Sequence, residues 1–218
     1  MMIRIALCFF FLNEVNRYNI EACELKNSGL TTSDKAQLVD VHNRLRAKVA
    51  NGQQTGQPSA ADMKQMKWDD ELAAKAQEWA NTCQGGHDLY DGRKTSKYPV
   101  AGQNFYASYA LGTGSANKIN LYSPVQAWYG EVKDFDRNAV KSYKFDPKTG
   151  HYSQVVWANT EAIGCGYVLF PRGSWTEQHI ICNYGPAGNF IGQPVYLEGT
   201  PASRCRSKST QYLGLCSS

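Results

Sequence analysis

Residues 150–157, with the sequence GHYSQVVW, constrain this chain more than any other stretch. On a short helix, Tyr152, Val155 and Val156 share one face, because side chains three and four residues apart lie together. His151 then points away from that buried face, toward a neighbouring cavity. A histidine in such a place is more often a core residue than a ligand. The stretch therefore predicts a functional site only in combination with other segments.

The length and charge of the chain limit the classes of protein to which it can belong. It has 218 residues, of which 42% are hydrophobic and 19% are charged, as is typical of one globular domain. The formal net charge of +4 is mild, and the basic residues are spread along the chain without blocks. The spacing of zinc fingers is absent as well. We therefore expect no nucleic-acid partner.

The first 22 residues have the pattern of a secretory signal peptide. Arg4 precedes an apolar run, residues 5–12, that is too short to span a bilayer as a helix. We expect residues 1–22 to be a signal peptide and residues 23–31 to form an N-terminal arm. The expected mature protein is secreted, extracellular and not membrane-spanning.

The cysteine count supports secretion. Of seven cysteines, Cys8 lies in the expected signal peptide, and the remaining six form an even set without a CxxC pair. This favours three disulfide bonds over thiol redox chemistry or structural zinc. Six cysteines allow many connectivities, so this count alone leaves the pairing open. No Asn-x-Ser/Thr acceptor occurs, and we expect no N-glycosylation.

Apolar periodicity predicts three helices before the central stretch, at residues 32–51, 69–83 and 123–135. Residues 91–120 show little periodicity, and we expect their Gly/Ser/Ala-rich part to be a loop. Two strand-like runs follow, at residues 163–170 and 179–184, with a hairpin loop of moderate length between them. Cys165 and Cys182 would lie on these neighbouring strands. The pattern predicts a mixed α/β (α+β) layered domain.

The combination of motifs resembles the CAP superfamily of cysteine-rich secretory, antigen 5 and pathogenesis-related 1 proteins. Residues 150–160, GHYSQVVWANT, match one family signature, and residues 180–190, IICNYGPAGNF, match the second. Residues 42–46, HNRLR, and Trp128-Tyr129 with Glu131 also stand where the family has them. The chain is most similar to the antigen 5 group, the insect venom allergen 5-like proteins.

The resemblance implies a three-layer α-β-α sandwich with a central antiparallel sheet, stabilised by disulfides and covering residues 32–196. It implies the disulfides Cys23–Cys83 and Cys165–Cys182. Cys205 and Cys216 are then left to close a loop in a short C-terminal tail, residues 197–218.

In this family, two histidines and two acidic residues line a large cleft. By motif, the resemblance places His87, His151 and Glu131 at three of these positions. The fourth position belongs to a Gly-Glu-Asn motif, but this chain has Gly102-Gln103-Asn104. An amide can keep the hydrogen bonds of a carboxylate, but it cannot take up a proton or offset a cation. We therefore expect no mechanism that needs two carboxylates at these positions.

Several functions fit these residues. A divalent-metal-dependent hydrolase or protease would use His87, His151 and Glu131, with Ser153 as a nucleophile candidate. With only His87 and His151 as ligands, zinc or another divalent metal would bind weakly, because protein zinc sites use three or four ligands. We favour a secreted, non-enzymatic protein with no required cofactor. It would bind a lipid, a sterol or a small hydrophobic mediator, or an extracellular protein partner.

Overall fold

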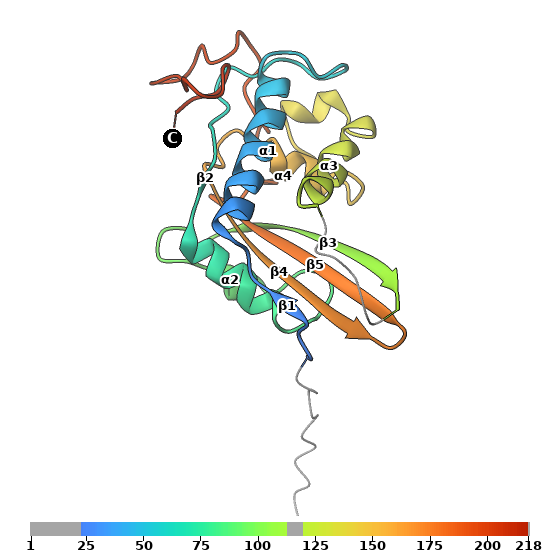
Figure 1. The fold of residues 1–218 in the computed structure, drawn as a ribbon. Helices are drawn as coiled ribbons and strands as arrows, with labels where there is room; N and C mark the ends of the chain where they lie inside the picture. Colours follow the sequence, from blue (N-terminus) through green and yellow to red (C-terminus); the bar gives the residue numbers. More distant parts are fainter. Residues whose placement is uncertain (1–22, 113–119, 218) are drawn as a thin grey trace, which may run out of the picture.

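The computed structural model describes residues 23–112 and 120–217. The predicted signal peptide therefore lies outside the described residues, as does part of the tract that we expected to be a loop. The described chain forms three layers, with a sheet between two sets of helices (Figure 1). None of its helices is long and apolar enough to cross a membrane.

The central layer of the described chain is a five-stranded sheet with the strand order β1-β4-β5-β3, in which β2 also pairs with β4. Its long strands, β3 (Gly102–Leu111), β4 (Ala162–Arg172) and β5 (Trp175–Gly185), are antiparallel. Two short strands pair with β4, β1 (Asn27–Ser28) antiparallel and β2 (Lys67–Trp68) parallel. The predicted antiparallel sheet is confirmed.

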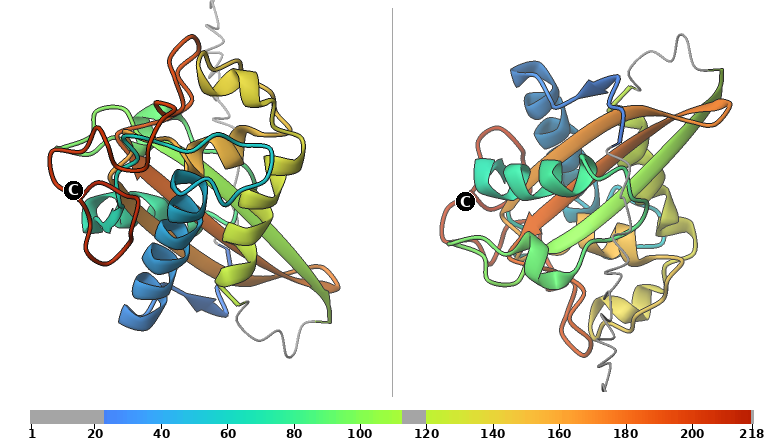
Figure 2. Two further views of the ribbon diagram at one scale, coloured as in Figure 1. Left: turned by 90° about the horizontal axis from the view of Figure 1, so that it is seen from above. Right: turned by 90° about the horizontal axis from the view of Figure 1, so that it is seen from below.

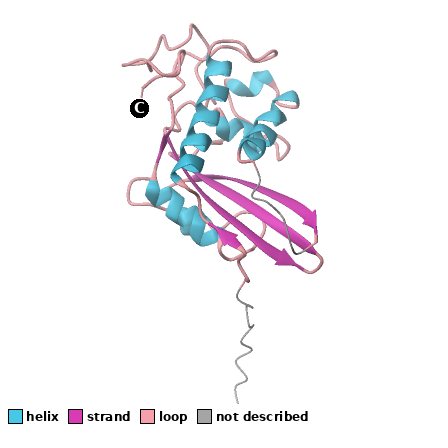
Figure 3. Ribbon diagram, in the orientation of Figure 1, coloured by secondary structure: helices cyan, strands magenta, loops and turns pink. Residues whose placement is uncertain are grey.

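Helices cover both faces of the sheet (Figure 2), and Figure 3 separates helices from strands by colour. One face carries α1 (Thr32–Ala50), α3 (Tyr122–Gly130) and α4 (Gly150–Val155), and the other carries α2 (Asp70–Ala80). Because strand residues alternate between faces, Ile163 and Cys165 join the larger core under α1, whereas Val168 and Phe170 pack with α2. The predicted α-β-α sandwich is thus observed.

Two glycines of β4 allow α2 to lie directly on the sheet. A Cβ at Gly164 would collide with the backbone nitrogen of Ala73, and one at Gly166 would lie 2.5 Å from the backbone nitrogen of Gln77. The side-chain amide of Gln77 then bonds the backbone of β4, because its Nε2 donates to Tyr167 O and its Oε1 accepts from Tyr167 N, each at 3.0 Å. Helix α2 is therefore held on the sheet by close backbone packing at the two glycines and by the amide of Gln77.

Two predictions about the strands were wrong. The hairpin loop is only Gly173 and Ser174, because the pairing of β4 with β5 continues as far as Arg172 and Trp175. The polar residues that suggested a longer loop, Thr176, Glu177 and Gln178, are buried in β5. β3 extends into residues that we expected to be a loop. Its strand pattern was not recognised, because its mixture of small, polar and aromatic side chains hides the alternation.

Three disulfides join the described cysteines, as Cys23–Cys83, Cys165–Cys182 and Cys205–Cys216. The first two are the pairs that the family resemblance implies, and the third is the pair that these two leave over. The second links residues that lie directly opposite each other on β4 and β5. The third closes the C-terminal tail, which is part of the core, because Leu215 is fully buried against it.

Arg46 connects α1 to the end of α4. Its guanidinium is fully buried and donates only to backbone carbonyl oxygens among the described residues, at 2.6–3.2 Å, namely those of Lys64, Val155, Trp157, Ala158 and Thr160. Val155 ends α4, where carbonyl groups have no partner within the helix. Burial lowers the pKa of Arg46 to about 9. This one side chain therefore fixes the helix that carries His151.

Replacing Arg46 with methionine should lower the free energy of unfolding by about 3 kcal/mol or more, because several buried carbonyl groups lose their donor. Its neighbour Arg44 is the matched control, since that side chain is 73% exposed and pairs with Asp40. Arg44→Met should change the free energy by less than about 0.5 kcal/mol. Urea unfolding measures both, and equal losses would contradict the role given to Arg46.

Candidate functional site

The short helix α4 presents His151 as the sequence predicts. Tyr152, Val155 and Val156 are fully buried in the main core. The side chain of His151 is 29% exposed and lines a cleft. The backbone of α4 is therefore held by its apolar face while His151 stays accessible.

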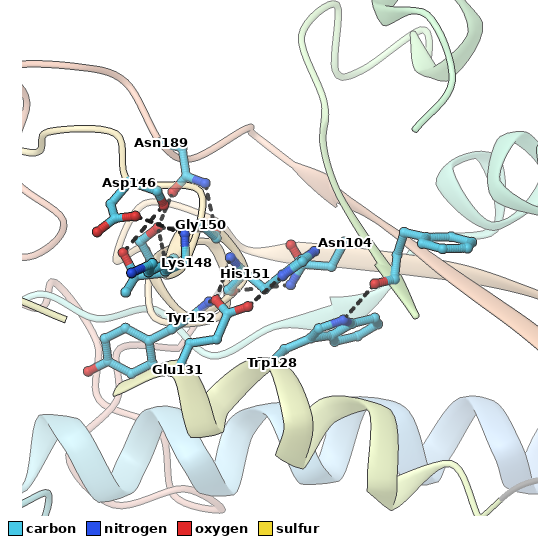
Figure 4. A network of polar contacts seen from close by, with 12 residues as sticks. Asn104, Trp128, Glu131, Asp146, Lys148, Gly150, His151, Tyr152 and Asn189 are labelled. Atoms are coloured by element: carbon cyan, nitrogen blue, oxygen red, sulfur yellow. Dashed lines mark hydrogen bonds and ion pairs between the residues drawn. The ribbon is translucent and has the colours of Figure 1, made fainter. Parts of the chain in front are cut away.

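Glu131 holds His151 in one orientation. It begins the 3₁₀ helix η2 (Glu131–Lys133), directly after α3. Its Oε1 accepts from Nδ1 of His151 at 2.7 Å, and its Oε2 accepts from the backbone N–H groups of His151 and Tyr152 at 2.9 and 3.0 Å (Figure 4). Because a carboxylate only accepts, Nδ1 carries a proton, and in the neutral ring the lone pair is therefore on Nε2.

Gln103, which lies on β3, holds His87 in one orientation. Its Oε1 accepts from Nδ1 of His87 at 2.9 Å and from the backbone N–H of Asp88 at 3.3 Å. Its Nε2 donates to Oδ1 of Asn183 at 2.9 Å, and Nδ2 of Asn183 donates to the carbonyl of Leu72 at 3.3 Å. The backbone N–H of Asp88 at one end and the backbone carbonyl of Leu72 at the other fix the orientation of both side-chain amides. His87 therefore also has a protonated Nδ1 and a free Nε2.

The two imidazole rings lie close together, with centroids 6.3 Å apart. The ring of His151 also stacks on Trp128, with centroids 6.2 Å apart and an angle of 23° between the planes. Trp128 is itself anchored, because its Nε1 donates to the carbonyl of Phe105 at 3.0 Å. Burial lowers the pKa of His87, and the hydrogen bond to Gln103 opposes part of that effect. His87 is thus favoured in its neutral form.

A cleft of about 650 Å³ contains both rings. Its lining includes the polar side chains of His87, Gln103 and His151, whereas Glu131 lies behind His151 and does not line it. Its rim is apolar and exposed, with Tyr90 at 72%, Phe145 at 61%, Val100 at 48% and Phe190 at 39%. The four predicted positions are therefore brought together, with three of them in the cleft.

Two charged residues of this cleft, Asp88 and Arg93, were not predicted from the sequence. Their side chains are only 5% and 7% exposed, and Oδ1 of Asp88 lies 2.6 Å from Nε of Arg93. Arg93, which ends the 3₁₀ helix η1 (Tyr90–Arg93), also donates from Nη2 to the carbonyl of Asp88 at 2.8 Å. The available sequence signal for this pair was an acidic residue directly after His87.

Two other polar residues of the motifs have structural roles. The Oγ of Ser153 is fully buried, 2.7 Å from Oδ1 of Asn189, and this removes Ser153 as a nucleophile candidate. His42 donates from Nδ1 to the carbonyl of Leu38 at 2.7 Å and accepts from the hydroxyl of Tyr184 at 2.9 Å. Burial lowers the pKa of His42 to about 4, so that its ring stays neutral.

The donor set of the cleft suits a loosely held cation. The described residues contain no group of three or more His, Cys, Asp or Glu side chains arranged to hold a metal ion. Two neutral imidazoles with free Nε2 atoms are suitable ligands for zinc or copper, provided that other molecules complete the shell. His87 and His151 fit such a cation, and Glu131 and Gln103 act behind them.

The described chain combines a layered fold, three disulfides and a cleft with paired histidines. These features define a disulfide-stabilised α+β domain. The model of the cysteine-rich secretory protein family, CAP, matches residues 39–184, and the chain belongs to this family. The resemblance found in the sequence is therefore confirmed.

Individual relatives agree with this assignment. Scoloptoxin SSD976 from Scolopendra dehaani is 46% identical over 196 residues, which cover 89% of each chain. Venom allergen 5 from Rhynchium brunneum is 41% identical over 179 residues, or 79% of this chain and 76% of that protein. The crystal structure of NaASP2 with Zn²⁺ has a TM-score of 0.70 at 28% identity, over 86% of this chain and 97% of that one.

Proposed function

We propose that this chain is a secreted, non-enzymatic binding protein of the venom allergen type. In this proposal, the cleft binds an extracellular protein partner and also holds a divalent cation through His87 and His151. The observation that carries the proposal is the pair of imidazoles whose Nδ1 atoms are occupied and whose Nε2 atoms are free.

Secretion is supported by the disulfides and by the relatives. Three disulfides in one domain are typical of proteins from oxidising compartments. The similar proteins from Scolopendra dehaani and Rhynchium brunneum are named as a toxin and a venom allergen. The N-terminal signal pattern agrees with both.

Cation binding is supported by the site and by one solved relative. Gln103 and Glu131 each accept from an Nδ1 atom, which fixes the tautomer that a metal ligand needs. The similar protein NaASP2 has been crystallised with Zn²⁺. With two ligands from the chain, binding would be weak and exchangeable, and water or a partner would complete the coordination.

The surface of the cleft favours a protein partner over a lipid, a sterol or a small hydrophobic mediator. A pocket that buries a hydrophobic molecule needs enclosed apolar walls, but here the large apolar side chains of the lining are exposed, Tyr90 at 72% and Phe145 at 61%. The exposed apolar surface also continues past the rim, because Leu89 and Ile191 are 83% and 75% exposed. Exposed aromatic side chains of this kind are common at the centre of protein interfaces.

The alternative of a metal-dependent hydrolase or protease has less support. Glu131 is the nearest candidate for a general base, but three hydrogen bonds already occupy its two oxygens. Ser153 is buried away from the cleft. Each described cysteine is in a disulfide, so that none is a nucleophile.

The cation is tested by calorimetric titration of the full mature chain with zinc. We expect one weak site in the wild type, and His87→Ala or His151→Ala should reduce the affinity at least about tenfold, because each removes one of two ligands. His42→Gln is the control, since His42 is buried behind Tyr184 and should leave the affinity unchanged. Equal affinity in the wild type and in His151→Ala would refute the cation site.

The partner is tested by immunoprecipitation of the natively secreted protein. Phe145→Ser should lose the co-purifying protein, because it removes an apolar contact at the rim. Tyr109→Ser is the matched control, since Tyr109 is 62% exposed, Phe145 is 61% exposed, and Tyr109 does not line the cleft. Identical partner recovery from both variants, or a bound lipid seen by native mass spectrometry, would contradict a protein partner.

A further inference from the structure

The amide at position 103 completes a chain of hydrogen bonds that an ionised carboxylate could not complete in the same way. Gln103 accepts from His87 and donates to Oδ1 of Asn183, and Asn183 cannot reverse its amide because its Nδ2 donates to the carbonyl of Leu72. A glutamate at position 103 would place a carboxylate oxygen against Oδ1 of Asn183, with no proton between them. With an amide at position 103, a negative charge beside His87 has to come from another residue.

Asp88 is the residue that supplies it. Its side chain lines the cleft directly after His87, although it is only 5% exposed. Its backbone N–H shares the acceptor Oε1 of Gln103 with the His87 ring, so that Asp88 and His87 are held by one atom. Its carboxylate acts to raise the pKa of the His87 ring. The same carboxylate would attract a cation bound to His87.

Arg93 opposes this charge. Its guanidinium lies 2.6 Å from Asp88, is 7% exposed, and also lines the cleft. The positive charge of Arg93 also lowers the pKa of the His87 ring, more strongly than the carboxylate of Asp88 raises it. The contact between the two side chains is an ion pair without good hydrogen-bond geometry, since neither Asp88 oxygen nor Nε of Arg93 meets the angular requirement of a hydrogen bond.

We propose that the Asp88–Arg93 pair sets the cation affinity of the cleft. Asp88 supplies the second carboxylate charge of the site, and Arg93 is a built-in cation that competes for it with the cation bound by His87 and His151. This inference rests on the proposed cation site and adds two positioning residues to it. It explains how a cleft with an amide at position 103 keeps a carboxylate near each histidine.

A purely structural ion pair would behave differently from a pair that sets affinity. If the pair only held the loop in place, removing either partner would loosen His87 and weaken cation binding. If the pair acts through charge, the two removals have opposite signs, because Asp88 attracts the cation and Arg93 repels it. The sign of the change therefore separates the two roles.

The experiment is zinc calorimetry on the full mature chain at neutral pH, with folding checked by circular dichroism. We expect Asp88→Asn to bind zinc about tenfold more weakly and Arg93→Gln about tenfold more tightly than the wild type. Each substitution removes one unit charge near the cation site. Asp91→Asn is the control, since Asp91 is in the same segment with an 85% exposed side chain and should leave the affinity unchanged.

A double variant keeps the test valid if Arg93→Gln leaves Asp88 buried without a partner and fails to fold. Asp88→Asn/Arg93→Gln has no net charge change, and it should bind zinc more tightly than Asp88→Asn alone. Zinc affinity that is unchanged in Asp88→Asn, or that falls further in the double variant, would overturn this inference and leave the cation site intact. A wild type that binds no zinc would overturn the proposed cation site itself.

Discussion

The buried guanidinium of Arg46 is the interaction on which the rest of the site depends. A full positive charge in the core is costly unless every donor is used, and here five carbonyl groups surround it without a carboxylate among them. These carbonyl groups belong to the segment before β2 and to the end of α4 with the turn after it. Helix α4 has only six residues, too few to be stable alone, so it exists because this contact and its apolar face hold it.

The consequence for function is a precise orientation of two imidazole rings. α4 brings His151 next to Glu131, whose carboxylate accepts from the side chain of His151 and from the start of the helix. The sheet brings Gln103 next to His87 through a chain of amides that begins at a backbone carbonyl of α2. Each ring is held from behind, so that its second nitrogen faces the cleft. Such contacts fix which ring nitrogen carries the proton, as they do in histidines that ligate metals.

Much of this fold can be predicted from local patterns. The caps and apolar stripes of α1 and α2 are strong signals, and Asp69 caps α2 as expected. The buried face of α4 follows from Tyr152, Val155 and Val156. The hairpin length cannot be predicted in this way, because Thr176, Glu177 and Gln178 are polar residues that are nevertheless buried in the sheet. β3 cannot be predicted either, because its small, polar and aromatic side chains hide the alternation of a strand. The ion pair of Asp88 and Arg93 was missed because its importance comes from burial and not from the spacing of the two residues.

The most direct measurement is long-range ¹H–¹⁵N correlation NMR of the histidine rings in the metal-free protein above pH 7. If the site is built as described, His87 and His151 will both show a protonated Nδ1 and a free Nε2, and added zinc will shift the Nε2 signals of these two rings. His42, whose Nε2 accepts from Tyr184, should show the same tautomer but no response to zinc. A protonated Nε2 on either His87 or His151 would contradict the central claim, because that ring could not present a lone pair to the cleft.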